Sequence, residues 1–196
     1  KYLPKLAAGE NIGAFCLSEP EAGSDATSQS TTAVDMGDHY LLNGTKNWIT
    51  NGNTCEIALV IAQTDREKGH RGINVLMVEK GMEGFVVGQK EDKLGIRGSD
   101  THTLLFNDVK VPKENRIGED GFGFKFAMKT LSGGRIGIAA QALGIAQGAL
   151  DLALAYSKER KTFGKPIHDH QAIAFKLADM EMKVEQARML VYKAAW

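Results

Sequence analysis

The hydrophobic pattern of the chain changes near Gly123, and this change limits the folds that the sequence can adopt. Before that point, apolar residues come in short runs separated by turn-forming residues. After it, apolar residues recur at spacings of three and four over long stretches. Short runs with regular turns are typical of antiparallel β-structure, and the longer spacing is typical of helices. We therefore expect an α+β chain in which the β-domain comes first.

The first part of the chain, residues 1–115, is predicted to form an antiparallel β-sandwich or barrel. Asn43 and Gly44 lie between two apolar runs and give the clearest hairpin signal, because this pair favours a tight two-residue turn. The predicted strands cover residues 14–18, 31–34, 40–42, 46–50, 57–63, 73–79, 85–89 and 103–109.

Residues 116–196 are predicted to form the first two long helices of an incomplete four-helix bundle. The first helix is apolar on almost every face, which predicts that it is buried. The second should begin near Asp169, which we expect to cap it. Because two helices cannot cover so much apolar surface, we expect further helices from outside this sequence. The core face predicted for the second helix comprises Ile173, Leu177, Met180, Val184, Ala187 and Val191.

Composition excludes some functions and leaves others open. Lysine plus arginine and aspartate plus glutamate number 24 each, so the formal net charge is zero, which gives no support to nucleic-acid or membrane binding through bulk charge. We expect no membrane-spanning stretch, no metal site and no signal peptide. Cys16 and Cys55 match no zinc or redox motif and predict a reducing compartment. The expected location is the cytoplasm, or the mitochondrial matrix in a eukaryote.

Two segments of the predicted β-domain carry candidate binding residues. Residues 15–25 turn from a strand into a loop where Ser18, Ser24 and backbone N–H groups can face an anion; the alternative, favoured by composition alone, is a polar loop with local hydrogen bonds. Trp48 stands beside Thr50 at a strand end, where an indole and a hydroxyl can meet an aromatic cofactor. Its alternative role is simple core packing.

The helical part carries two candidate arginines. Arg135 follows Gly133 and Gly134 on an otherwise apolar helix, so its charge needs either a ligand or an internal carboxylate. Arg160 and Thr162 precede a turn and suit a phosphate, although a cation at a helix C-terminus is also favourable without any ligand.

Taken together, these segments resemble the acyl-CoA dehydrogenase family, specifically its butyryl-CoA and short-chain branch. The resemblance spans the whole chain in order. It rests on LSEPEAGSD at residues 17–25, WIT at 48–50, KLGIRGS at 93–99, VKVP at 109–112, GRIGI at 134–138, and RKTFG at 160–164 with Gln171.

The resemblance implies an FAD site between the β-domain and the bundle of a neighbouring subunit in a homotetramer. Flavin contacts are implied for Phe15, Cys16, Leu17, Ser18, Gly23, Ser24, Trp48, Ile49 and Thr50, with Thr50 near the flavin N5. Arg160, Thr162 and Gln171 would reach the FAD of the adjacent subunit, with Arg160 at the pyrophosphate. The acyl-CoA site would be lined by Ser24, Ser132, Gly133, Gly134 and Arg135.

The implied reaction is the oxidation of an acyl-CoA thioester to a trans-2-enoyl-CoA, with electrons passed to an electron-transfer flavoprotein. The sequence departs from the family pattern at two positions. Gly134 stands where a minority of members hold the catalytic glutamate, and Ser132 stands where short-chain relatives commonly have aspartate. We therefore expect no catalytic base in this chain and no activity from it alone. The alternatives are an acyl-CoA oxidase or flavin monooxygenase relative, or a non-catalytic β-sandwich binding module.

Overall fold

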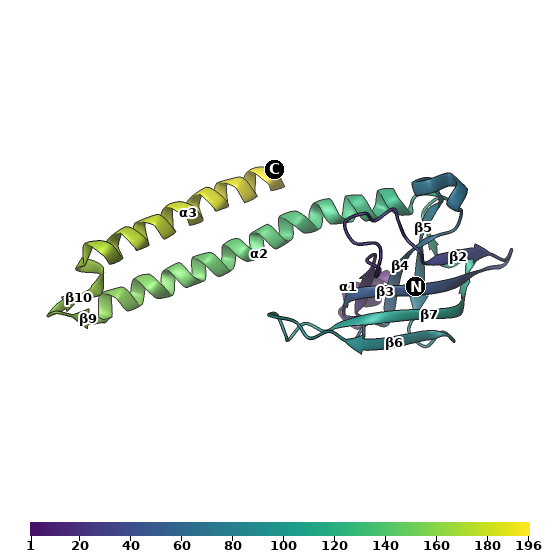
Figure 1. Ribbon diagram of the computed structural model, residues 1–196, viewed down its shortest axis with the longest axis horizontal. Helices are drawn as coiled ribbons and strands as arrows, with labels where there is room; N and C mark the ends of the chain where they lie inside the picture. Colours follow the sequence, from purple (N-terminus) through teal and green to yellow (C-terminus); the bar gives the residue numbers. More distant parts are fainter. The chain divides into compact units, whose positions relative to one another are not determined.

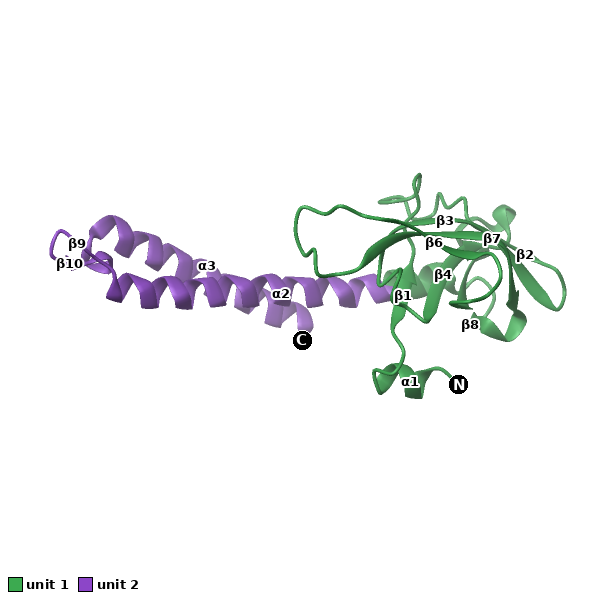
Figure 2. Cartoon of the chain, turned by 90° about the horizontal axis from the view of Figure 1, so that it is seen from below, with its two compact units in different colours: residues 1–128 green, residues 129–196 purple.

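The computed structural model describes residues 1–196 as two compact units, residues 1–128 and 129–196 (Figure 1; Figure 2). Helix α2, Gly123–Glu159, begins in the first unit and continues through the second. The domain boundary expected after residue 115 stays a prediction.

The first unit is a β-structure with one short helix, as the punctuated apolar runs predict. Strands β4 and β5 have the predicted bounds, and β6 and β7 extend beyond theirs. Its elements are α1 Leu3–Ala7, β1 Gly13–Cys16, β2 Thr32–Asp35, β3 His39–Thr50, β4 Ile57–Gln63, β5 Ile73–Glu79, β6 Phe85–Lys90, β7 Thr101–Pro112 and β8 Arg116–Ile117, with 3-10 turns at Arg66–Gly72 and Lys113–Asn115.

The eight strands form one mixed sheet in the order β6-β7-β3-β2-β4-β5-β8, and β1 also pairs with β4. Most pairs are antiparallel, but β1 and β2 each run parallel to β4. The α+β class is confirmed, and these two parallel pairs are the departure from a wholly antiparallel sheet. They arise because the long segment between β1 and β2 allows both strands to use the same edge of β4. One buried cluster draws side chains from β1, β2, β3, β4, β5 and β7, so the sheet curls around its own core.

The hairpin predicted at Asn43 and Gly44 is wrong, because both residues lie inside the single long strand β3. Gly44 has φ +147°, and a Cβ there would lie 2.4 Å from Thr31 Oγ1. The glycine therefore permits the close approach of another segment, which is a common reason for glycine inside a strand. Asn43 Nδ2 donates to Asp108 Oδ1 on the neighbouring strand β7 at 2.9 Å. The Asn-Gly pair serves cross-strand contacts at this position and makes no turn.

The second unit consists of most of α2, a small hairpin and helix α3. The hairpin strands are β9 Lys161–Thr162 and β10 Lys165–Pro166, and a 3-10 turn at Ile167–Asp169 leads into α3, Gln171–Ala195. Asp169 was expected to cap this helix, but His170 occupies the N-cap and no side chain caps it. The reason is that Asp169 belongs to the 3-10 turn, which ends before the helix begins. Its Oδ1 atom lies 3.1 Å from His168 Nε2.

The two long helices touch along one narrow face each. Leu143 and Leu150 of α2 pack on Val184 of α3, flanked by the predicted face residues Met180, Ala187 and Val191. The opposite face of α2, which includes Ile138, Ile145 and Leu152, is exposed. The expectation that α2 is buried on all sides is therefore not met by these two helices alone.

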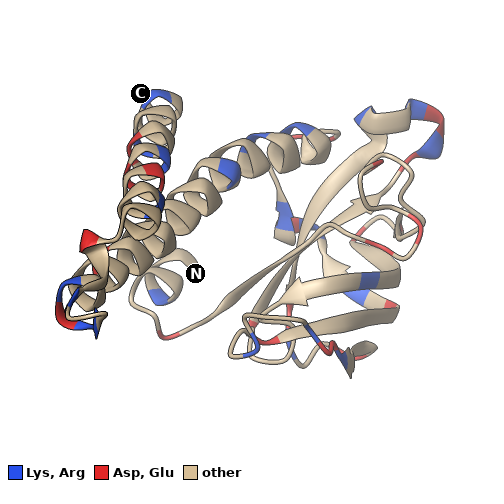
Figure 3. Ribbon diagram, turned by 60° about the vertical axis from the view of Figure 1, so that its left-hand side comes forward, with Lys and Arg blue, Asp and Glu red and all other residues tan.

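Helix α2 also corrects an expectation about membranes. It is long and apolar enough to cross a bilayer, by length and composition only, whereas the sequence was expected to hold no such stretch. Residues 136–150 carry no charge, and Figure 3 shows this uncharged length of helix. A core helix of a soluble bundle meets the same criterion, so the finding is weak evidence for a membrane.

Candidate functional site

Trp48 lies in a β-bulge that turns its side chain out of the sheet. Between the pairs Lys46–Leu104 and Ile49–His102, β3 contains one more residue than β7. Trp48 takes up this extra length with φ +60°, a backbone conformation that is rare for bulky residues and often marks functional positions. Its side chain is 61% exposed, so Trp48 is not core packing in this unit.

The turn after β1 lies directly beside this bulge. Asn47 N–H donates to Ser18 O at 2.9 Å, which brings the residue before Trp48 against the predicted serine loop. Residues 19–22 close a tight turn through reciprocal backbone hydrogen bonds between Glu19 and Ala22. The structure therefore brings Ser18 next to the Trp48 segment, as the predicted site requires.

A buried ion pair fixes the turn to β3. Lys46 Nζ lies 2.7 Å from Glu19 Oε1 and donates to Leu17 O at 3.0 Å, and both charged side chains are fully buried. Glu19 Oε2 accepts from Ser30 N at 2.6 Å and from Thr31 N at 3.1 Å. The carboxylate therefore joins the two ends of the segment that leads from β1 to β2.

The electrostatics of this pair follow from its burial. Burial pushes the pKa of Glu19 upward, but Lys46 and the hydrogen bonds from Thr31 and Ser30 outweigh it and lower that pKa. Burial lowers the pKa of Lys46, and Glu19 opposes this shift. We consider the pair ionised, because the carboxylate is held by several donors in addition to the ammonium. Sequence reasoning missed both residues, although Lys46 continues the inward alternation of Tyr40 and Leu42, a position where lysine needs a partner.

Local hydrogen bonds, the alternative role of the serine loop, account for only part of it. Asp25 Oδ1 accepts from Thr27 N at 3.2 Å and from Thr27 Oγ1 at 2.7 Å, so residues 25–27 form a self-contained polar turn. Gly23 and Ser24 precede that turn and are exposed. This part of the loop therefore remains open to a ligand.

Three of the predicted flavin contacts have side chains that face the core. Cys16, Leu17 and Ile49 are buried, and Cys16 and Ile49 belong to the central cluster. Any contact from these three residues would come from the main chain. Phe15 is half-buried, with its ring centroid 6.4 Å from that of Phe126.

The turn that follows Thr50 is held by Asp100, a residue that the sequence analysis did not single out. Asp100 Oδ2 accepts from Asn53 N at 2.9 Å and from Thr54 N at 3.0 Å, while Oδ1 lies 2.6 Å from His102 Nδ1. Burial raises the pKa of Asp100, but these hydrogen bonds and His102 outweigh it and lower that pKa. Thr50 itself is exposed. The segment from Trp48 to Thr50 is thus held on both sides, with Trp48 and Thr50 exposed and Ile49 buried between them.

The predicted residues of the second unit are accessible to a ligand. Ser132, Gly133, Gly134 and Arg135 are exposed on α2. No carboxylate of the chain forms an ion pair with Arg135, so the internal salt bridge that competed with a ligand does not form.

One of the residues predicted to bind phosphate in this unit already has a hydrogen-bond partner within the chain. Arg160 and Gln171 are exposed. Thr162 is half-buried, and its Oγ1 lies 2.9 Å from His170 Nε2. The hydroxyl therefore already has a partner, whereas the guanidinium of Arg160 remains open to an anion.

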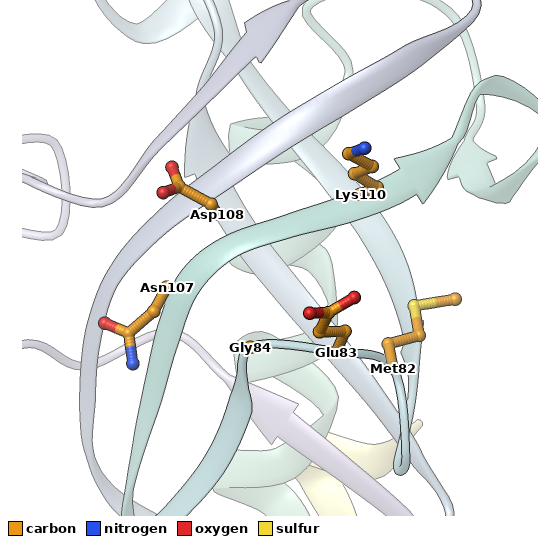
Figure 4. Close-up of a pocket in the computed structure, with 6 residues that line it drawn as sticks. All are labelled: Met82, Glu83, Gly84, Asn107, Asp108 and Lys110. Carbon is orange, nitrogen blue, oxygen red and sulfur yellow. The ribbon is translucent and has the colours of Figure 1, made fainter.

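An open hollow of about 590 Å³ lies elsewhere in the first unit, between the turn before β6 and the strand β7 (Figure 4). It is lined by Met82, Glu83, Gly84, Asn107, Asp108 and Lys110. None of these residues was predicted as a site. The main chain brings Ser18 beside the Trp48 segment, so we take Ser18 and Trp48, with the exposed Ser24 and Thr50 of the same two segments, as the candidate site and call these four residues the flavin surface.

The flavin surface fits an aromatic cofactor with hydrogen-bonding edges. It offers an exposed indole for stacking and an exposed hydroxyl on Thr50. Aromatic area and hydroxyls are groups that suit an isoalloxazine ring.

Comparisons with known proteins show which family the chain belongs to. The family model "Acyl-CoA dehydrogenase, middle domain" matches residues 14–109, and "Acyl-CoA dehydrogenase, C-terminal domain" matches residues 121–196. The short-chain specific acyl-CoA dehydrogenase of Clostridium acetobutylicum is 56% identical over 196 residues, which are 100% of this chain and 52% of that protein. The CarC subunit of the caffeyl-CoA reductase-Etf complex of Acetobacterium woodii is 55% identical over 195 residues, 100% of this chain and 52% of that protein.

A solved structure supports the same assignment. Butyryl-CoA dehydrogenase from Megasphaera elsdenii matches with a TM-score of 0.94 and 55% identity, covering 98% of this chain and 50% of that one. The chain thus spans about half the length of the curated relatives it matches. Because the two family models together match most of its residues, the chain belongs to the acyl-CoA dehydrogenase family of flavoprotein oxidoreductases.

Proposed function

We propose that this chain forms the flavin-binding and thioester-binding part of an enzyme that oxidises acyl-CoA to trans-2-enoyl-CoA and passes electrons to an electron-transfer flavoprotein. The observation that carries the proposal is Trp48, whose indole is 61% exposed on a backbone with φ +60° beside Ser18. FAD is the cofactor that family membership assigns. The cofactor's contribution, when bound, is to accept a hydride equivalent from the β-carbon of the acyl chain.

The residues of the first unit would bind and orient the ring. Trp48 would pack against it, and the Thr50 hydroxyl would donate a hydrogen bond to its edge. Ser18, Gly23 and Ser24 would meet its polar substituents, with Ser24 also near the thioester. Phe15, Cys16, Leu17 and Ile49 would contribute main-chain contacts or packing from behind.

The residues of the second unit would act on the diphosphate and the substrate. Arg160 would bind the pyrophosphate of FAD held by another copy of the chain in a homotetramer, with Thr162 and Gln171 beside it. Ser132, Gly133, Gly134 and Arg135 would line the acyl-CoA site. The absence of a carboxylate partner for the exposed Arg135 supports a ligand role for its charge.

The base that removes the α-proton would come from outside these residues. Gly134 offers no carboxylate, and α2 holds no carboxylate on the turn that carries Ser132 and Arg135. We therefore expect the isolated chain to be inactive. Incubating it with FAD, butyryl-CoA and an artificial electron acceptor should give no enoyl-CoA; turnover by the isolated chain would show that it contains a base.

The test of the proposed function uses the intact enzyme, meaning a protein of the relatives' full length that contains this chain. It should purify with FAD and oxidise a series of acyl-CoA thioesters with an artificial acceptor. Fast peroxide formation by the reduced enzyme would favour an oxidase instead. Reduction of an enoyl thioester in a complex with its electron carrier would match the named activity of the Acetobacterium woodii relative. A colourless enzyme that takes up no FAD would overturn the proposal.

We expect the intact enzyme in the cytoplasm of a bacterium, or in the mitochondrial matrix of a eukaryote.

A further inference from the structure

We propose that Lys46 and Glu19 are positioning residues for the flavin surface: their ion pair holds the Ser18 turn beside Trp48 in the arrangement that receives the ring. This inference rests on the proposed function. Neither side chain would touch the cofactor, since both are fully buried. Their effect would pass through the main chain of the two segments that they join.

Lys46 lies in β3 two residues before Trp48. Lys46, Asn47 and Trp48 follow one another, and each makes a different contact. Lys46 Nζ contacts Glu19 and Leu17 O, Asn47 N–H donates to Ser18 O, and Trp48 is the exposed bulge residue. The strand is therefore attached to the turn at two consecutive residues immediately before the indole.

The Glu19 carboxylate connects Lys46 to the residues just before β2. One oxygen receives the Lys46 ammonium, and the other receives the backbone N–H groups of Ser30 and Thr31. The residues between Glu19 and Ser30 include Gly23 and Ser24, which form no ladder with any strand. The carboxylate thus closes the loop that carries these predicted contacts, and its loss would free both ends of that loop.

Burying the charges of Lys46 and Glu19 costs free energy. A buried lysine and glutamate lose their hydration, and an apolar pair of similar volume is often as stable or more stable. A well-packed pair of methionine and leucine would serve the core, so stability alone does not explain the charges. What an apolar pair could not do is bind Leu17 O and the N–H groups of Ser30 and Thr31 at fixed positions. The charged pair therefore fixes the positions of the main-chain groups beneath the flavin surface.

The test measures FAD affinity and the flavin absorption spectrum in three variants of the intact enzyme. Glu19→Gln is close in shape but turns one acceptor into a donor, which must face either the Lys46 ammonium or the N–H groups of Ser30 and Thr31. The double variant Lys46→Met with Glu19→Leu replaces the whole pair with apolar groups. Val111→Ala is the matched control, because it opens a core cavity at the end of β7 that pairs with Tyr40, far along β3 from Trp48.

We expect Glu19→Gln and the double variant to raise the dissociation constant for FAD by about tenfold or more. A loss of this size is typical when residues that orient the ligands of a metal site are removed. The bound flavin should show a changed absorption spectrum in both. Val111→Ala should lower the melting temperature yet keep the wild-type affinity and spectrum. If Glu19→Gln does not fold, the double variant decides the question, because it removes both buried charges together and leaves neither one unpaired.

The two proposals fail in different ways. A wild-type enzyme that binds no FAD would overturn the proposed function. A wild-type enzyme that binds FAD, together with variants that fold and bind it with the same affinity and spectrum, would overturn the positioning role. A loss of affinity in Val111→Ala equal to that in the double variant would also overturn it, because the effect would then follow stability alone.

Discussion

The two units of this chain differ in how much of their apolar surface they bury. The β-unit encloses its own core, in which Leu42, Val60 and Phe106 are at most 1% exposed. The helical unit buries only a narrow face between α2 and α3 and leaves residues such as Leu152 at 74% exposure. The first unit can therefore shape a binding surface from internal contacts. The second leaves apolar side chains that α2 and α3 do not cover.

The largest expected effect is in the core of the β-unit. Phe106→Ala removes a ring that packs on Phe85 at a centroid distance of 5.1 Å. It should lower the free energy of unfolding by about 3–5 kcal/mol. Chemical denaturation followed by circular dichroism measures this change. A loss under about 1 kcal/mol would show that the core of the β-unit is not closed.

The next prediction compares two leucines on the same helix. Leu150→Ala, at a position 2% exposed, should cost about 2 kcal/mol in the isolated chain. Leu152→Ala, 74% exposed, should cost about 0.5 kcal/mol or less there.

The same pair in the intact enzyme sharpens the comparison. If neighbouring helices cover the outer face of α2, the cost of Leu152→Ala should rise toward that of Leu150→Ala. Thermal denaturation of both variants in both proteins measures this. An equal, small cost for Leu152→Ala in the two proteins would mean that this face stays uncovered.

A third prediction concerns Asp100, whose carboxylate holds the turn after Thr50. Asp100→Asn should lower the free energy of unfolding at pH 7 by about 1.5 kcal/mol, since it removes a charged acceptor from buried hydrogen bonds. The pKa of Asp100 is lowered below 3.8 in the folded state, so its stabilising effect is present above that pH and is lost as the pH falls through the folded value.

The difference between Asp100 and the variant should therefore be constant above about pH 5 and shrink only in stronger acid. Urea denaturation at a series of pH values measures it. A difference that grows as the solution is acidified would contradict the assignment.

The smallest expected effect concerns Trp48. Trp48→Ala should weaken FAD binding by about 0.5–1.5 kcal/mol, roughly two- to tenfold in Kd. Because the indole is 61% exposed, the stability without FAD should change by only about 0.5 kcal/mol. Trp48→Phe keeps an aromatic face and should recover most of the affinity. Fluorescence titration of the intact apoenzyme with FAD measures all three, and equal affinities would remove Trp48 from the site.

Much of the fold follows from local pattern. Strands β4 and β5 are continuous apolar runs flanked by turn residues, and their bounds come out as predicted. The face of α3 that packs on α2 follows the predicted spacing through Val184. These elements are predictable because the periodicity of a single segment decides which side is buried.

What the sequence could not predict depends on contacts between distant segments. Gly44 reads as a turn residue until the closeness of Thr31 is known. The exposure of Trp48 depends on a bulge set by the pairing of β3 with β7. Lys46 becomes interpretable only once Glu19 is seen to lie 2.7 Å away. The motifs located the candidate site, whereas its supporting residues required the fold.

The central claim is that the surface of Ser18, Ser24, Trp48 and Thr50 receives the flavin ring. The most direct measurement is a crystal structure of the intact enzyme with FAD bound. We predict that the isoalloxazine ring lies in van der Waals contact with the Trp48 indole, at about 4 Å, with Ser18 and Thr50 at its edges. A flavin bound elsewhere, for example in the hollow between Gly84 and Asp108, would contradict the assignment.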